Sequence, residues 1–167
     1  MLHEHAKLLS LLKGTGEVVG RKKLQKMVYI AKKMNEPFRE KYQFHMYGPY
    51  SEELTLRMEE MCQADFIGEV REKKGGYYQY RYEIADKGEE FLEAVRLPEG
   101  TVNENLLRRL NESSSKFLEL VSTVLYFEHF PKEEIKAKIG KLKARQNYSE
   151  EDIEEAFSYI ESLRNSH

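Results

Sequence analysis

The stretch that decides the fold spans residues 22–50 and reads KKLQKMVYIAKKMNEPFREKYQFHMYGPY. Its first half repeats apolar residues three and four positions apart, which predicts an amphipathic helix with one buried face. Asn35 and Pro37 end this helix, because proline disfavours helical geometry in the residue before it. An aromatic segment with Gly48 and Pro49 at its centre follows and predicts a tight turn. The apolar stripe of the helix consists of Leu24, Met27, Val28, Ala31 and Met34.

Helices are predicted on both sides of this stretch. Before it, apolar residues predict a helix that ends at Gly14 or Gly16. After it, Ser51 is a suitable N-cap for a third helix, SEELTLRMEEMCQ. The apolar side of the third helix holds Leu54, Met58, Met61 and Cys62.

A β-hairpin and a further helix come next. Residues 66–73 and 77–84 predict two strands, joined by a turn with two glycines. Residues 86–95 predict a helix that opens with a capping box at Asp86. Helix, helix, hairpin and helix in this order is the layout of a winged helix. The sequence therefore predicts a mostly α fold with a small β-hairpin (α+β), a winged-helix domain over residues 1–97.

A boundary is predicted at Leu97-Pro98-Glu99-Gly100, and everything after it has helical periodicity. The prediction is an α-helical appendage over residues 98–167, with one long helix bent near residues 111–115. A shorter helix opens at Pro131, and Ser149 caps the last one. The apolar faces of these helices are too large for a solvated tail. We therefore expect them to pack on their own chain or on a second copy, so a homodimer is possible.

The composition describes a soluble chain whose charge is unevenly distributed. Over 167 residues the net charge is −2, which argues against a strong nucleic-acid binder. Residues 1–50, however, hold 10 Lys and Arg against 4 Asp and Glu, so DNA binding stays possible. A single cysteine fits the reducing cytoplasm. No apolar run approaches the roughly 18 residues that a membrane span needs, so we expect no membrane partner.

No catalytic residue, cofactor or metal ligand is predicted. Cys62 lies on the apolar side of its helix, and no base is identifiable near it, so we interpret it as a core thiol. His3 and His5 are two positions apart and point to different sides of a helix, which prevents chelation of one metal. The other histidines are isolated. Among the functions considered, an enzyme with an unrecognised site is the least favoured.

The turn at residues 47–50 is the candidate protein-binding surface. Gly48 and Pro49 force a tight turn, and they hold Tyr47 and Tyr50 with little freedom. Rigid tyrosines lose little entropy on contact and are favoured as interface anchors. The alternative is that the two tyrosines wedge the second and third helices against each other.

A basic surface is the candidate for nucleic-acid binding. Four residues of the second helix follow a spacing that places them on one face opposite the apolar stripe, where they could neutralise phosphates. The hairpin turn adds lysines that could act as a wing; the alternative for both is a lysine-rich surface that serves solubility. Against DNA stands the third helix, because its four glutamates would face the phosphates of a groove. The candidate residues are Lys22, Lys26, Tyr29, Lys33, Lys73 and Lys74.

Three segments carry a resemblance to a known family: KKLQKMVYIAKKM, FHMYGPYSEEL and YEIADKGEEFLE. They resemble the YwgA-like family of uncharacterised bacterial proteins and, more distantly, the Panacea domain of SocA-type antitoxins. The shared signature covers roughly residues 20–60. The distant resemblance implies a protein-binding role without catalysis, with a toxin or a regulatory protein as partner. It also implies that Leu24, Tyr29 and the turn at residues 47–49 shape the core or surface of the family.

From the sequence we therefore expect a non-catalytic, cytoplasmic regulatory protein that binds another protein, in the manner of an antitoxin or an adaptor. The alternative is a DNA-binding transcriptional regulator that uses the basic second helix and the hairpin wing.

Overall fold

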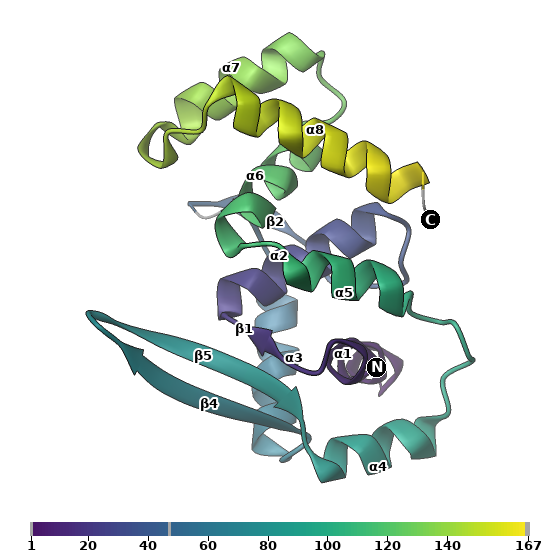
Figure 1. Cartoon of the computed structure of the whole chain (residues 1–167). Coiled ribbons are helices and arrows are strands. Elements are labelled where there is room, and N and C mark those ends of the chain that lie inside the picture. Colours follow the sequence, from purple (N-terminus) through teal and green to yellow (C-terminus); the bar gives the residue numbers. More distant parts are fainter. Residues whose placement is uncertain (1, 47, 166–167) are drawn as a thin grey trace.

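The computed structural model describes residues 2–46 and 48–165, and over these residues the fold is mostly helical with two small antiparallel sheets (Figure 1). The helices are α1 (Leu2–Thr15), α2 (Arg21–Lys33), α3 (Glu52–Gln63), α4 (Asp86–Val95), α5 (Glu104–Glu112), α6 (Ser115–Tyr126), α7 (Lys132–Leu142), the 3-10 turn η1 (Ala144–Gln146) and α8 (Glu150–Asn165). The strands are β1 (Val18–Val19), β2 (Gln43–His45), β3 (Gly48–Tyr50), β4 (Ile67–Lys74) and β5 (Tyr77–Ile84).

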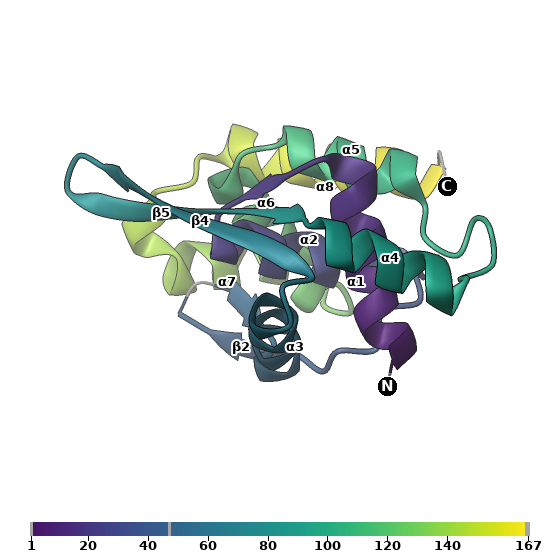
Figure 2. The same ribbon diagram turned by 90° about the horizontal axis from the view of Figure 1, so that it is seen from below.

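The predicted hairpin is confirmed to within one residue at its ends. β4 and β5 pair from Ile67 opposite Ile84 to Lys74 opposite Tyr77, and β1 adds a short third strand beside β5. Gly75 in the turn has a φ of +57°, which a residue with a side chain adopts less readily. Seen from below, the hairpin extends well away from the helices (Figure 2).

The aromatic segment does turn back on itself, as the small ribbon β2–β3, but Gly48 and Pro49 lie in β3 and not at the centre of the turn as predicted. Phe44 pairs with Pro49, and His45 pairs with Gly48. Tyr47, one of the predicted interface residues, lies outside the residues that the structure describes. The ribbon lies against α2 and α6, and Phe44 packs on the rings of Tyr126 and Phe127.

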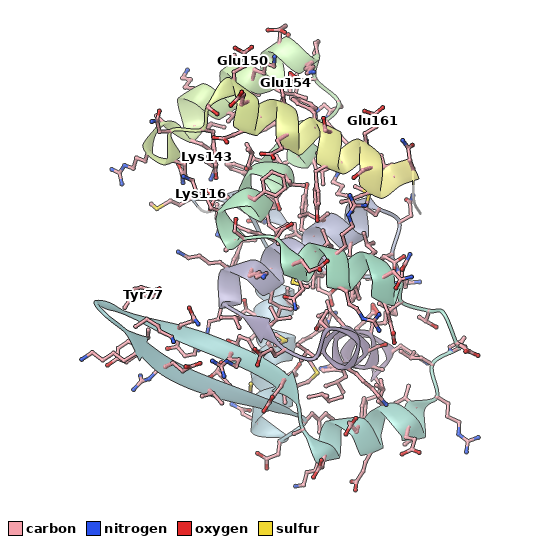
Figure 3. The ribbon with its side chains drawn as sticks, viewed as in Figure 1. Tyr77, Lys116, Lys143, Glu150, Glu154 and Glu161 are labelled. Atoms are coloured by element: carbon pink, nitrogen blue, oxygen red, sulfur yellow. The ribbon has the colours of Figure 1, made fainter. Side chains whose placement is uncertain are left out.

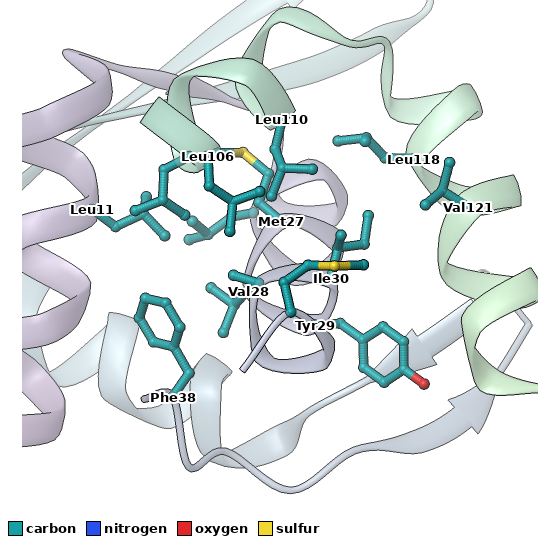
Figure 4. Packing of buried hydrophobic residues seen from close by; sticks show 14 of the residues in the cluster. Leu11, Met27, Val28, Tyr29, Ile30, Phe38, Leu106, Leu110, Leu118 and Val121 are labelled. Atoms are coloured by element: carbon teal, nitrogen blue, oxygen red, sulfur yellow. The ribbon is translucent and has the colours of Figure 1, made fainter. Parts of the chain in front are cut away.

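Helix α2 occupies the centre of the fold. The sequence predicts a helix with one buried face, but every residue from Leu24 to Ala31 is buried. Helices α1 and α5 cover the apolar stripe, and α6 covers much of the opposite side (Figure 4). The single-face prediction is wrong because it was read from α2 alone, whereas the segment after residue 100 packs over its more polar side.

The helix ends agree with the sequence in most places. Ser51 Oγ accepts a hydrogen bond from Leu54 N at 3.1 Å, and Ser149 forms a reciprocal capping box with Asp152. The predicted capping box at Asp86 is wrong, because α4 has Ala85 as its N-cap, with no side-chain cap. The predicted long bent helix is two helices, and Ser114 caps the second of them.

One hydrophobic cluster runs through the whole fold, from Leu8 in α1 to Leu163 in α8. The irregular segment between α4 and α5 contains the predicted boundary at residues 97–100. Helices α5 and α6 nonetheless contact α1 and α2 closely. Within the described residues, no helix has the length and apolar character that crossing a membrane requires.

Candidate binding site

A cleft of about 670 Å³ opens between α2, α3, the β2–β3 ribbon and the base of the hairpin. Its volume lies within the range of roughly 300–1,000 Å³ that is usual for sites that bind small organic molecules. The apolar part of its lining comes from the facing sides of α2 and α3, with Leu24, Leu54 and Met58. The charged side chains lie toward the two ends of the cleft. One end is beside the ribbon, and the other is at the base of the hairpin.

Lys26 lines the ribbon end of the cleft and is only 2% exposed. Its ammonium lies 3.4 Å from the carbonyl oxygen of Lys22 and 3.9 Å from Glu119 Oε1. Both distances exceed the roughly 2.7–2.9 Å of a good charge-assisted hydrogen bond. Burial lowers the pKa of Lys26 to about 8, against the opposing effect of Glu119, and the nearby Lys22 and Lys143 lower it further.

Glu119 is held more tightly by a second buried lysine. Lys143 Nζ lies 3.1 Å from Glu119 Oε2 and donates to the carbonyl oxygen of Met46 at 2.8 Å. Gln146 donates to the same carboxylate oxygen at 3.0 Å. Two buried ammonium groups therefore share the charge of one buried carboxylate, and Lys26 has the longer contact.

The ribbon forms the wall beside Lys26. Gly48 has a φ of +94°, and a Cβ there would lie 3.7 Å from Glu119 Cγ. Gly48 and Pro49, two residues of the predicted protein-binding turn, are both buried. Of the residues of this turn that the structure describes, Tyr50 is therefore the one that a partner protein could contact. The Tyr50 ring stacks on His45 with centroids 5.0 Å apart, and its hydroxyl lies 2.7 Å from Thr55 Oγ1.

The hairpin end of the cleft is built around Arg21. Its Nε donates to the hydroxyl of Tyr82 at 2.8 Å, and its guanidinium lies 3.8 Å from the centroid of the Tyr80 ring. Glu69 accepts from the same guanidinium at 3.3 Å. The acidic and basic groups of this end thus largely compensate each other.

Cys62 also lines the cleft. The prediction of a core thiol is only partly right, since the side chain packs against the core but remains half-buried. Burial raises the pKa of the Cys62 thiol, and Glu69 adds to the effect. A raised thiol pKa disfavours the nucleophilic thiolate at neutral pH.

The structure does not assemble the predicted basic surface. Lys26 and Tyr29 are buried, so the prediction that they share an accessible face with Lys22 is wrong. Tyr29 packs edge-on against Tyr42, and Lys33 is half-buried with Glu128 at 3.7 Å. Lys73 and Lys74 are exposed and pair across the hairpin with Tyr78 and Tyr77. Tyr77 lies near the hairpin tip, away from α2 (Figure 3). Only Lys22 and Lys26 of the set line the cleft.

Sequence analysis missed Glu119, Lys143 and Gln146, which come from segments far from α2 along the chain. Glu119 does leave a signal, since it lies between Leu118 and Leu120 and is the single acidic residue of α6. No spacing rule connects it to Lys26. Among residues 2–46 and 48–165, no group of three or more His, Cys, Asp or Glu side chains is arranged to hold a metal ion.

The chain is similar over almost its whole length to a bacterial protein. It is 53% identical over 164 residues to "Uncharacterized protein YwgA" of Bacillus subtilis (strain 168), which covers 98% of both chains. No family model matches the chain, so the more distant resemblance to the Panacea domain stays a prediction.

Proposed function

The chain belongs to the YwgA family, and from its surface we propose that it is a non-catalytic regulatory protein of the cytoplasm that acts by binding another protein. The relative carries no stated activity, so the proposal depends on the side chains that this fold presents to solvent. Two exposed regions are candidates for the contact: the outer side of α3 with the adjacent ribbon, and the tip of the hairpin.

We infer that the first half of the chain is a winged helix. The order of α1, α2, α3, the β4–β5 hairpin and α4 supports this assignment, as does the short strand β1 beside β5. In such a domain α3 is the helix that would present its outer side to a partner. Its exposed residues therefore indicate what kind of partner is suitable.

The outer side of α3 carries the proposal. It exposes Glu52, Glu59 and Glu60, and between them Leu56 is 59% exposed. On the neighbouring ribbon, Met46 is 74% exposed. Carboxylates would be repelled by phosphates, whereas an exposed leucine and methionine among acidic residues suit a basic, partly apolar protein surface.

A DNA-binding regulator is the second candidate, and one observation favours it. Arg71, Lys73 and Lys74 are exposed near the hairpin tip, where Tyr77 is 63% exposed. A basic and aromatic tip can contact a phosphate backbone. The burial of Lys26 and Tyr29 removes the helical half of that surface, so the hairpin would have to act with Lys22 alone.

The test compares two substitutions of exposed leucines. The full-length protein, a Leu56→Asp variant and a Leu142→Asp variant are used as bait in the lysate of the source bacterium. Leu142 is 52% exposed at the end of α7, which makes it a matched control. The proposal requires a protein that the wild type and Leu142→Asp retain and Leu56→Asp loses. The purified partner must then bind with the same ranking in calorimetry.

A different result would favour the second candidate. If no protein distinguishes the two baits, and the wild type shifts duplex DNA at low salt, the protein-binding proposal is wrong. In that case a Lys73→Glu, Lys74→Glu double variant should lose the shift, and added salt should weaken it steeply.

A further inference from the structure

We propose that the cleft between α2 and α3 binds a small carboxylate with an apolar body, and that the ammonium of Lys26 is the group that anchors it. This site adjoins the outer side of α3, because Glu59 and Met46 also line the cleft, and it would make the protein responsive to a small organic acid. The inference is independent of which macromolecule the protein binds.

The first observation is the charge balance at the ribbon end of the cleft. Glu119 gives its short contact, 3.1 Å, to Lys143, and its contact with Lys26 is 3.9 Å. Lys26 is nevertheless almost completely buried. A buried cation is costly unless an anion compensates it closely. A carboxylate in the cleft would supply that second negative charge.

The second observation is that Lys26 lines an open space. The cleft holds about 670 Å³, and Lys26 and Lys22 are both among its lining residues. A lysine that only closed the core would have protein atoms on every side. Lys26 is only 2% exposed, so a small part of its surface borders this volume, which is large enough for an organic molecule.

The third observation is how the charged and apolar lining residues are arranged along the cleft. From Lys26 the lining passes over Leu54 and Met58 to Cys62 and the hairpin end. The carboxylates at that far end are Glu69, which Arg21 engages, and the exposed Glu59. Arg21 compensates the charge of Glu69, so Glu59 leaves this end with a net negative charge, which disfavours a second anion there. The cleft therefore suits a molecule with one anionic end at Lys26 and an apolar remainder.

The test measures binding of decanoate, with 1-decanol as the neutral analogue of the same length. Lys26→Met removes the charge and keeps an unbranched apolar side chain. Lys33→Met removes a charge from the same helix outside the cleft. Affinities are read from displacement of the neutral dye N-phenyl-1-naphthylamine from the full-length protein.

We expect the wild type and Lys33→Met to bind decanoate equally well. Lys26→Met should bind it at least about tenfold more weakly, and its affinity for 1-decanol should stay within about twofold of the wild type. Equal decanoate affinity in Lys26→Met would overturn the proposal. A parallel loss of 1-decanol binding would also overturn it, because the lysine would then only shape the cleft.

A measurement on the unaltered protein keeps the test decisive if Lys26→Met fails to fold. Cys62 is the single cysteine and lines the cleft, so it reports on occupancy. Decanoate should slow its reaction with the neutral reagent 4,4′-dithiodipyridine at least about tenfold at saturation, assuming that bound ligand blocks most of the access. If the rate of Cys62 labelling stays unchanged at every decanoate concentration up to the micelle threshold, the proposal is contradicted.

Discussion

Lys143 and Glu119 form a buried ion pair of 3.1 Å that joins the segment after α7 to the middle of α6. Lys143 also donates to the carbonyl oxygen of Met46, so one ammonium connects the C-terminal helices, α6 and the β2–β3 ribbon. The ribbon is one wall of the cleft. Through this pair, the part of the chain after residue 100 fixes the geometry of a site made largely from the first half.

Replacing Glu119 with Gln should therefore destabilise the protein strongly. The change keeps the shape of the side chain and leaves two buried lysines without a carboxylate, which we expect to cost about 3–5 kcal/mol. Urea unfolding followed by circular dichroism measures the loss. The control is Glu128→Gln, whose ion pairs with Lys33 and Arg164 are more exposed, and whose cost should be below about 1 kcal/mol. Equal costs for the two variants would contradict the role of the buried pair.

Gly88 in α4 should not tolerate even a methyl group. A Cβ at this position would lie 2.1 Å from the backbone oxygen of Phe66, and neither backbone can move without disturbing the base of the hairpin. We expect Gly88→Ala to destabilise by about 2 kcal/mol or more, as overpacking does. Gly140 in α7 is the matched control, because a Cβ there meets nothing within 4 Å. Gly140→Ala should stabilise by about 0.5–1 kcal/mol. Urea unfolding of both variants measures whether the free energy of unfolding falls or rises.

Ending the chain after Leu97 should yield a fragment that aggregates or lacks cooperative unfolding. The cut removes α5 and α6, which cover α2 on two sides. It exposes the apolar surface that Leu118, Val121 and Leu125 bury, and each such side chain contributes roughly 1.5–3 kcal/mol. Size-exclusion chromatography and thermal unfolding of the 1–97 fragment measure the outcome. A monomeric fragment with one sharp transition would show that the two parts fold independently.

The sequence predicted the elements well because their signals are local. The Ser51 cap, the glycine turn of the hairpin and the stop at Asn35 each depend on a few consecutive residues, and each is present. The position of α2 in the fold was not predictable in the same way. Its basic residues indicate a solvated face, and the packing of α6, the ribbon and Tyr42 around α2 buries Lys26 and Tyr29.

The candidate site likewise combines features that local sequence signals predict with contacts between distant residues that they do not. A turn within residues 44–50, at the ribbon that forms one wall of the cleft, was predicted because glycine and proline favour turns, but the pairing of β2 with β3 was not. The ion pair of Lys26 with Glu119 was not identified, nor was the competing Lys143, because both residues are more than ninety positions away in the chain. Pairings over such separations leave no periodic pattern in the sequence.

Replacing Lys26 with Met should stabilise the protein at pH 7. Burial lowers the pKa of Lys26 from 10.5 to about 8, so the folded state holds the charged ammonium at a cost of up to about 3 kcal/mol. The variant removes that cost, and Glu119 keeps its bond to Lys143. A gain of 1 kcal/mol should raise the melting temperature by about 2–4 °C in a chain of this size. A lower melting temperature would contradict the view that Lys26 is retained for binding.

The advantage of Lys26→Met should disappear as the pH rises. Between about pH 8 and pH 10.5 the unfolded wild type binds more protons at this lysine than the folded wild type does. The stability that this group contributes to the wild type therefore increases with pH over that interval, and the cost is fully present only below it. Urea unfolding of both proteins at pH 7, 9 and 10.5 should show the difference in unfolding free energy shrinking toward zero. A difference that stays constant across the three pH values would mean that the ammonium of Lys26 is not responsible for it.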